Sequence, residues 1–402
     1  MILIKNGLLI IENKLVKKDV LIGEGKILSI QDNIEGDYQT IDASKCLVME
    51  GGCDVHVHLR EPGFEHKETI LSGTRSAAKG GFTSIMAMPN LRPCPSDVAS
   101  LNVQLELIRK DAVVNVYPYA SVSINEEDKE LSDIDNLHDL VYAFSDDGRG
   151  VNNLELLENA MKKAKKYNFI IASHAEDNLY KTSPEGEYLA VRREIELAKK
   201  IGCHYHFCHL STKESFEEIR KARKEGFTNI TCEITPHHLL LNDTMIKNGN
   251  YKMNPPLRSE EDRKATVEAL LDGTASMIAS DHAPHSKEEK ALELSKCPNG
   301  IIGLETSFPL IYTYFVKTGL ISLQKMVELF VKKPLEIFSL PKYGMYEGSN
   351  ANIIILDINN EREYKEDEIV SKGKNSPFIG YKLYGFNKAT IVNGEIVYLR
   401  KD

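Results

Sequence analysis

Cysteine is scarce in this sequence, and its spacing fits no known framework. The seven cysteines, at positions 46, 53, 94, 203, 208, 232 and 297, form no Cys-x-x-Cys pair. An odd number of cysteines without such pairs argues against a disulfide scaffold and against a thiolate zinc finger. This usage indicates a reducing compartment such as the cytoplasm, with most cysteines acting as small buried residues.

Long apolar runs and blocks of like charge are missing too. No apolar stretch approaches the roughly 18 residues of a membrane span, and the start, Met1 to Gly7, lacks the order of a signal peptide. The net charge of −9 arises from interleaved lysine and glutamate, which does not favour a nucleic-acid surface. We therefore expect a soluble, cytoplasmic protein whose partner is a small molecule, with no membrane or nucleic-acid partner.

Short alternating apolar stretches occupy both ends of the chain and predict β-hairpins. They run from Met1 to about Cys46, and again at Asn352–Asp357 and Ala389–Tyr398. Asn-Gly turn signals stand at Asn6-Gly7 and Asn393-Gly394. We expect the two ends to pair as one small β-sandwich domain, made of residues 1–47 and 343–402, around a catalytic domain of residues 48–342.

Between the ends, strand-like runs alternate with amphipathic helical stretches, which is typical of a parallel sheet with helical crossovers. The expected strands end near His58, Met88, Tyr119, Ser145, His174, His209, Thr235 and Asp281. About eight such units in roughly 300 residues is the size of a (β/α)₈ barrel. A doubly wound open sheet is the alternative, but no Gly-rich phosphate loop follows the first strand.

Metal-binding side chains stand at several of these strand ends. In the segment Gly52 to Gly63, His56, His58 and Arg60 are two residues apart and share one face of an extended chain. His-x-His alone is as readily a core or surface pair. The other metal-capable strand ends are His174, His209, Asp281 and the pair Asp146-Asp147. Because strand ends of a barrel converge on one mouth, this set predicts a site for one or two zinc or related ions.

Other histidines and one cysteine are assigned more ordinary roles. His204 and His206 lie at the start of their strand and are expected to be structural. Alternation along the strand predicts that Cys208 points away from the face of His209. His237 and His238 follow the next strand, and the sequence does not decide whether they support a metal ligand or contact the substrate.

Four longer motifs carry a resemblance to a known family. They are Asp54-Val-His-Val-His-Leu-Arg-Glu-Pro-Gly63, Met88-Pro-Asn90, Lys252-Met-Asn-Pro-Pro-Leu-Arg258 and Ala279-Ser-Asp-His-Ala-Pro-His285. Together the motifs resemble bacterial dihydroorotases of the amidohydrolase superfamily, in the group with the longer chain. The resemblance implies a zinc-dependent cyclic amide hydrolase that interconverts N-carbamoyl-L-aspartate and (S)-dihydroorotate in de novo pyrimidine biosynthesis.

The resemblance also implies roles for individual residues. The implied metal ligands are His56, His58, Asp147, His174, His209 and Asp281. Asp281 would also move protons, and Asp147 would bridge two metals where many relatives use a carboxylated lysine; Asp146 is the alternative bridge. The implied substrate contacts are Arg60, Asn90, Asn254, His285, Pro298 and Gly300.

The sequence departs from the family pattern at two positions, and several other functions are alternatives. Leu91 stands where threonine is common after Met-Pro-Asn, and Asn299 replaces the phenylalanine of a Pro-Phe-Gly loop. The rivals are allantoinase, hydantoinase or dihydropyrimidinase, and a non-catalytic partner of aspartate carbamoyltransferase. Arg60 favours a ring that carries a carboxylate, as dihydroorotate does. The resemblance further suggests a homodimer that docks aspartate carbamoyltransferase.

Overall fold

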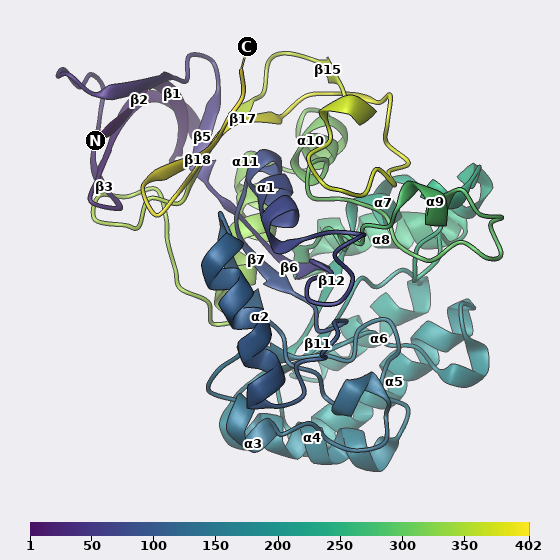
Figure 1. The fold of residues 1–402 in the computed structure, drawn as a ribbon. Helices are drawn as coiled ribbons and strands as arrows, with labels where there is room; N and C mark the ends of the chain where they lie inside the picture. The colour runs from purple at the N-terminus through teal and green to yellow at the C-terminus, as the bar shows by residue number, and fades with distance from the viewer. Residues whose placement is uncertain (402) are drawn as a thin grey trace.

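A computed structural model describes residues 1–401, in which both chain ends build one eight-stranded sheet. The strand order is β18-β17-β14-β5-β1-β2-β3, with β4 also paired to β1. The bounds are β1 Ile2–Ile11, β2 Lys14–Gly23, β3 Lys26–Gln31, β4 Gln39–Asp42, β5 Leu47–Glu50, β14 Ile353–Asp357, β17 Phe386–Val392 and β18 Glu395–Leu399. Both termini lie beside this sheet, at the top of Figure 1. The sheet runs to Glu50, slightly past the expected boundary at residue 47.

The two Asn-Gly signals have different outcomes. Asn393 and Gly394 both have positive φ, 49° and 83°, and they join β17 to β18 as the two-residue turn that this pair predicts. The prediction for Asn6-Gly7 is wrong. These residues lie inside β1, where the register shifts between Ile4 and Gly7 as in a β-bulge. The turn itself falls at Glu12 and Asn13, which have positive φ.

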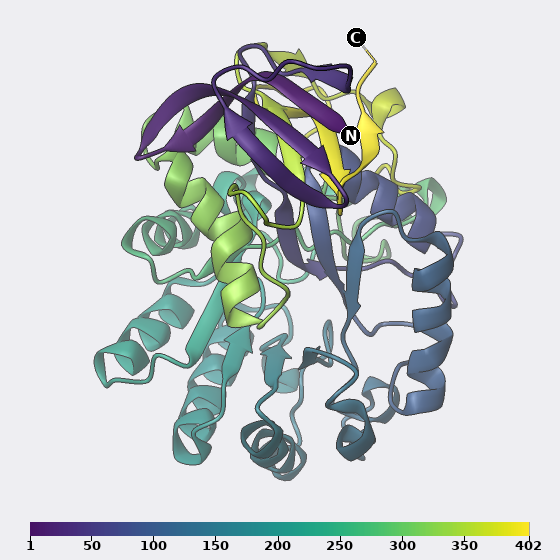
Figure 2. The same ribbon diagram turned by 90° about the vertical axis from the view of Figure 1, so that its left-hand side faces the viewer.

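Eight short parallel strands form a barrel, which lies below the small sheet in Figure 2. They are β6 Gly52–Val57, β7 Phe82–Ala87, β8 Asn115–Pro118, β9 Ala143–Phe144, β10 Ile170–Ser173, β11 Tyr205–Phe207, β12 Ile230–Ile234 and β13 Met277–Ile278. Bridges between Ala120 and Phe144 and between Val57 and His282 join the three-stranded and five-stranded parts. The fold class expected from the sequence is confirmed, and the open-sheet alternative is excluded.

Helices that follow the strands cover the outside of the barrel. The longer ones are α1 Ile70–Gly80, α2 Val98–Asp111, α4 Leu154–Tyr167, α5 Pro184–Ile201, α6 Lys213–Lys224 and α8 Glu260–Asp272. The shorter ones are α3 Ile134–Leu137, α7 Pro236–Leu240, α9 Lys287–Lys290, α10 Ser307–Ile311, α11 Leu323–Val327 and α12 Lys333–Ile337. None of these helices in residues 1–401 is both long and apolar enough to traverse a bilayer.

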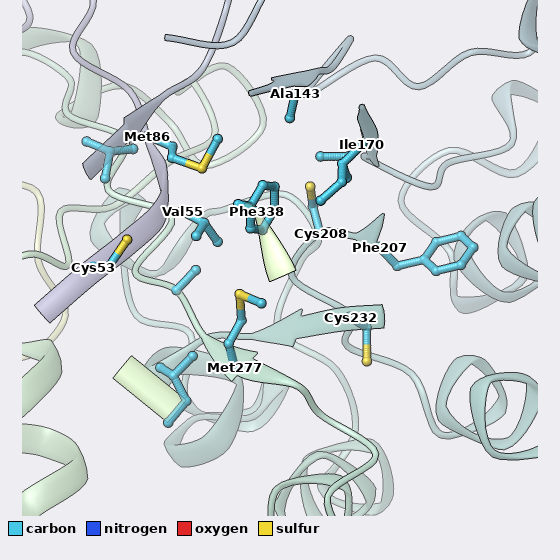
Figure 3. Packing of buried hydrophobic residues seen from close by; sticks show 14 of the residues in the cluster. Cys53, Val55, Met86, Ala143, Ile170, Phe207, Cys208, Cys232, Met277 and Phe338 are labelled. Atoms are coloured by element: carbon cyan, nitrogen blue, oxygen red, sulfur yellow. The ribbon is translucent and has the colours of Figure 1, made fainter. Parts of the chain in front are cut away.

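The barrel interior is apolar at its lower end and polar at its mouth. Val55, Ile170 and Cys208 gather around the ring of Phe338, whereas Phe207 points outward toward the helices (Figure 3). Phe338, which follows α12, packs edge-on against His206 with ring centroids 5.1 Å apart. This packing closes the bottom of the barrel, so that a ligand enters only from the end where the strands finish.

A C-terminal segment reaches back to that mouth. Tyr364, Phe378 and Leu383 form a separate buried cluster with Leu241 and Ile301, which follow barrel strands. The small hairpin of β15 Arg362–Glu363 and β16 Lys382–Leu383 belongs to this segment. Residues that follow the sheet domain's strand β14 therefore also support the mouth of the barrel.

Candidate metal centre and active site

Histidine and aspartate side chains from five strand ends meet at the mouth of the barrel. His56 lies in β6 and His58 just after it, while Asp147, His174 and His209 follow β9, β10 and β11. Two groups of three have ligand atoms within 4.8 Å of one another: His56, His58 and Asp147, and Asp147, His174 and His209. All are at least nine-tenths buried. Asp147 belongs to both groups, which is the position of a bridging ligand.

The neighbouring Asp146 has a different role. Its carboxylate accepts hydrogen bonds from the backbone N–H of Val122, at 2.8 Å, and from the backbone and hydroxyl of Ser123. Burial raises the pKa of Asp146 to about 6, although these hydrogen bonds oppose the shift. The geometry thus places Asp147 rather than Asp146 among the histidines and uses Asp146 to hold the loop after β8.

The distances between these atoms fit a metal ion. Four ligands placed tetrahedrally at about 2.0–2.1 Å from zinc stand about 3.3–3.4 Å apart. Asp147 oxygens lie 3.3 Å from Nε2 of His56 and of His58, 3.4 Å from Nε2 of His209, and 3.6 Å from Nδ1 of His174. Nε2 of His56 and Oδ1 of Asp147 are buried, yet they make no hydrogen bond of good geometry within residues 1–401. A shared cation would satisfy both atoms.

Asp281 completes this cluster after β13. Its Oδ1 is 3.3 Å from Nε2 of His58 and 3.5 Å from Nε2 of His56. Burial alone would raise the pKa of Asp281, but the hydrogen bond from His58 and the charges of His56 and His209 hold it well below the usual range. The carboxylate is therefore ionised at neutral pH, ready to accept a proton or to bind a cation.

Sequence reasoning missed Glu233, which lies behind His56. Glu233 stands in β12, is fully buried, and places Oε1 2.6 Å from Nδ1 of His56. Burial would raise its pKa, but His56 and His206 lower it to about 2, so the carboxylate accepts and Nδ1 of His56 donates. This fixes the tautomer that leaves a lone pair on Nε2 for a metal. The signal was a lone carboxylate within the apolar run Ile230-Thr-Cys-Glu-Ile234.

The strand before Glu233 brings two further side chains near His56, and one of them corrects a prediction. His206, expected to be structural, is buried, and its Nε2 lies 3.1 Å from Oε2 of Glu233, whose other oxygen contacts His56. Cys208 does not point away: its sulfur lies with His56 and Glu233 in one compact group. Alternation fails because β11 ends at Phe207 and His209 has a positive φ of 32°, which turns both side chains inward.

Backbone strain is concentrated at this mouth. His209, Asp281 and Arg60 adopt positive φ values of 32°, 47° and 62°. Residues other than glycine rarely adopt such φ values, and the backbone strain costs of the order of 1–3 kcal/mol per residue. Here each unusual φ directs a functional side chain toward the same space.

A cavity of about 300 Å³ opens in front of the cluster. Among the predicted substrate contacts, it is lined by Arg60, Asn90, Asn254 and Gly300. His285 and Pro298 do not line the cavity. His285 lies behind it, with Nε2 2.7 Å from the carbonyl oxygen of Asn299, which does line the cavity. Phe64, Lys67, Arg92 and Glu126 also line it and were not predicted.

Arg60 supplies an unpaired positive charge to this cavity. Its Nε donates to the carbonyl of Pro284 at 3.3 Å, and it forms no ion pair within residues 1–401. Burial lowers its pKa, an effect that the charges of Asp281 and Asp147 oppose. A half-buried guanidinium without a carboxylate partner is suited to an anionic ligand.

Asn90 lines the cavity, but its amide nitrogen is already used in two hydrogen bonds within the protein. Its Nδ2 donates to Oε1 of Glu126 at 2.8 Å and to the carbonyl oxygen of Asp147 at 2.6 Å. Oδ1 of Asn90 remains buried without a partner within residues 1–401. An amide oxygen can accept from a ring N–H but cannot donate to a carboxylate. Burial, with the charges of Asp146 and Asp147, raises the pKa of Glu126 to about 8.

Comparisons with known sequences give a consistent result. A family model described as Dihydro-orotase-like matches residues 45–184. Dihydroorotase of Staphylococcus epidermidis is 46% identical and covers 98% of this chain and 99% of its own. That of Fusobacterium nucleatum is 44% identical, covering 100% and 99%, and that of Bacillus cereus is 43% identical, covering 97% and 96%.

Solved structures with the same fold come from related enzymes. L-hydantoinase of Arthrobacter aurescens superposes with a TM-score of 0.90 at 26% identity, covering 100% of this chain and 96% of its own. Dihydropyrimidinase of Brevibacillus agri superposes with a TM-score of 0.88 at 25% identity, covering 100% and 95%. The fold agrees over the whole chain, while the sequence is far nearer to the dihydroorotases.

Proposed function

The chain belongs to the dihydroorotase family, and we propose that it interconverts N-carbamoyl-L-aspartate and (S)-dihydroorotate, a step of de novo pyrimidine biosynthesis. It is a hydrolase that acts on cyclic amides. The observation that carries the choice of substrate is the unpaired guanidinium of Arg60, in the cavity that opens onto the histidine and aspartate cluster.

We propose that the metal is zinc, with one or two ions per chain. Four imidazoles and two carboxylates, without a thiolate, form a donor set that zinc accepts. His56, His58 and Asp281 would hold one ion, His174 and His209 the other, and Asp147 would bridge them. When bound, such an ion lowers the pKa of water toward 7 and polarises the amide carbonyl.

We propose that Asp281 is the proton carrier. In hydrolysis, its ionised carboxylate would take a proton from the attacking water and deliver it to the ring nitrogen as the C–N bond breaks. In ring closure, it would take the proton from the ureido nitrogen as the C–N bond forms and pass it to the hydroxyl that leaves the substrate's protonated carboxyl group as water. Glu233 would keep Nε2 of His56 free of a proton throughout.

The substrate carboxylate separates this reaction from its rivals. Dihydroorotate carries a carboxylate on its ring, whereas hydantoin, dihydrouracil and allantoin do not. With those rings Arg60 would be covered by the ligand without gaining an anionic partner, which opposes their binding. We propose that Asn90 and Asn254 orient the ring beside the carboxylate; Nδ2 of Asn254 lies 3.0 Å from Nε2 of His174.

The proposed function is tested by following both directions of the reaction before and after metal removal. We expect the purified protein to form dihydroorotate from N-carbamoyl-L-aspartate and to hydrolyse it, to lose both activities with a chelator, and to regain them with zinc. Activity that survives complete removal of metal would contradict the proposal. A non-catalytic dihydroorotase-like protein would show neither activity after zinc is restored.

We further propose, from the family resemblance, a cytoplasmic homodimer that docks aspartate carbamoyltransferase. Light scattering on the eluting protein, alone and with that enzyme, tests both associations. A single peak at the mass of one chain would contradict the dimer.

A further inference from the structure

Lys290 is a buried lysine whose ammonium group contacts three main-chain carbonyls instead of a carboxylate. It is the last residue of α9 and is 6% exposed. Nζ donates to the carbonyl oxygens of Lys252 at 3.1 Å, Pro298 at 2.9 Å and Gly300 at 2.8 Å. It forms no ion pair within residues 1–401. Three N–H donors thus meet three acceptors, so the hydrogen-bonding capacity of the ammonium is fully used.

These carbonyls belong to two walls of the catalytic cavity. Lys252 precedes the cavity residue Asn254 by two positions, and Gly300 lines the cavity together with Asn299. The two walls also meet directly, because the backbone N–H of Gly300 donates to the carbonyl of Lys252 at 3.0 Å. The ammonium of Lys290 lies behind this contact and joins both segments.

Close packing holds the end of α9 against the segment before Lys252. A Cβ on Gly249 would come within 2.3 Å of the carbonyl oxygen of Lys290, so only glycine lets the segment before Lys252 approach α9. Within residues 1–401, the carbonyl of Pro298 has no hydrogen-bond donor other than Lys290. The carbonyl of Gly300 has a second donor, Asn375, at 3.0 Å. Loss of the ammonium would therefore leave Pro298 buried in part and without a partner.

We propose that Lys290 is a positioning residue for the reaction: its ammonium fixes the 298–300 loop against the Lys252 segment, so that the backbone of Asn299 and Gly300 presents a set surface to the substrate ring. This inference rests on the proposed function, since it assigns a role in the same cavity. Burial lowers the pKa of Lys290 to about 8, which still keeps the charged form prevalent at pH 7. A charged donor makes stronger hydrogen bonds to carbonyls than a neutral one does.

The test compares Lys290→Met and Lys290→Gln with the control Lys287→Met. Lys287 lies on the same helix, but its side chain is 81% exposed, and within residues 1–401 its only ion pair is with Glu366, at 3.7 Å. We expect KM for dihydroorotate to rise about tenfold in Lys290→Met, as for the loss of one charged hydrogen bond, with kcat and bound metal nearly unchanged. The KM of Lys290→Gln, which keeps two N–H donors, should lie between those of Lys290→Met and the wild type. The KM of Lys287→Met should equal that of the wild type.

Hydrogen exchange supplies a readout that does not depend on turnover. The Gly300 amide should exchange faster in Lys290→Met and Lys290→Gln than in Lys287→Met, while amides in the barrel strands keep their protection. Unchanged exchange, or a KM within twofold of wild type, would overturn the inference. If Lys290→Met does not fold, Lys290→Gln decides by the same criteria. If the wild type turns over another ring instead, the proposed function fails, and the comparison is made with that ring.

Discussion

Replacing Arg60 with glutamine isolates the charge that selects the substrate. Within residues 1–401, the side chain of Arg60 has contacts of hydrogen-bond length only with Pro284 O at 3.3 Å and His285 Nε2 at 3.5 Å. The fold should therefore lose little, and the change should appear in substrate binding. Loss of a charge-assisted pair that the bound ring shields from water costs about 2–4 kcal/mol, which lowers kcat/KM for dihydroorotate by about 30- to 700-fold.

The matched control is Arg92→Gln. Arg92 lines the same cavity, but its guanidinium donates to the carbonyl of Leu91 at 2.7 Å. We expect Arg92→Gln to change kcat/KM by less than about fivefold, since Arg92 is exposed and solvent screens its charge. Steady-state hydrolysis is measured with dihydroorotate and with uncharged dihydrouracil, and bound metal is quantified in each protein. Indifference of dihydroorotate turnover to the loss of Arg60, with metal retained, would refute the assignment of the carboxylate pocket.

Three further substitutions or treatments test the metal cluster. Asp281→Asn should keep the fold and most bound metal, measured by elemental analysis, but reduce turnover by about 10²- to 10⁴-fold, because an amide cannot relay the proton; near-normal hydrolysis would exclude that role. Glu233→Gln should weaken metal binding about 10- to 100-fold in competition with a chelator, because the carboxylate that orients the His56 ring is lost. An unchanged affinity would show that Glu233 does not orient this ligand. Chelation should lower the melting temperature of the wild type, since bound metal stabilises the folded state by mass action, and equal melting temperatures with and without metal would contradict a bound ion.

Strand ends were the part of the fold that the sequence predicted well. Several of the parallel strands are short, mainly apolar runs that end next to a functional residue, as β10 ends before His174. Convergence of these ends then follows from barrel geometry alone. The predicted metal-binding residues lie together for this reason.

Features that depend on local backbone or on distant segments could not be predicted in the same way. The inward turn of Cys208 follows from the positive φ of His209, which no pattern of apolar residues reveals. Glu233 stands inside a strand rather than at its end, so its partners are visible only when β6, β11 and β12 are assembled. Asn375 lies in the C-terminal segment, and its side chain is hydrogen-bonded to the backbone of His285 and of Gly300.

The reaction itself is tested most directly by comparing kcat/KM of the zinc-loaded wild-type protein for dihydroorotate, dihydrouracil, hydantoin and allantoin under one set of conditions. The site predicts that dihydroorotate exceeds each uncharged ring by at least about 10²-fold, because only its carboxylate pairs with Arg60. Turnover of dihydrouracil, hydantoin or allantoin above that of dihydroorotate would contradict this account and leave only the fold and the metal chemistry standing.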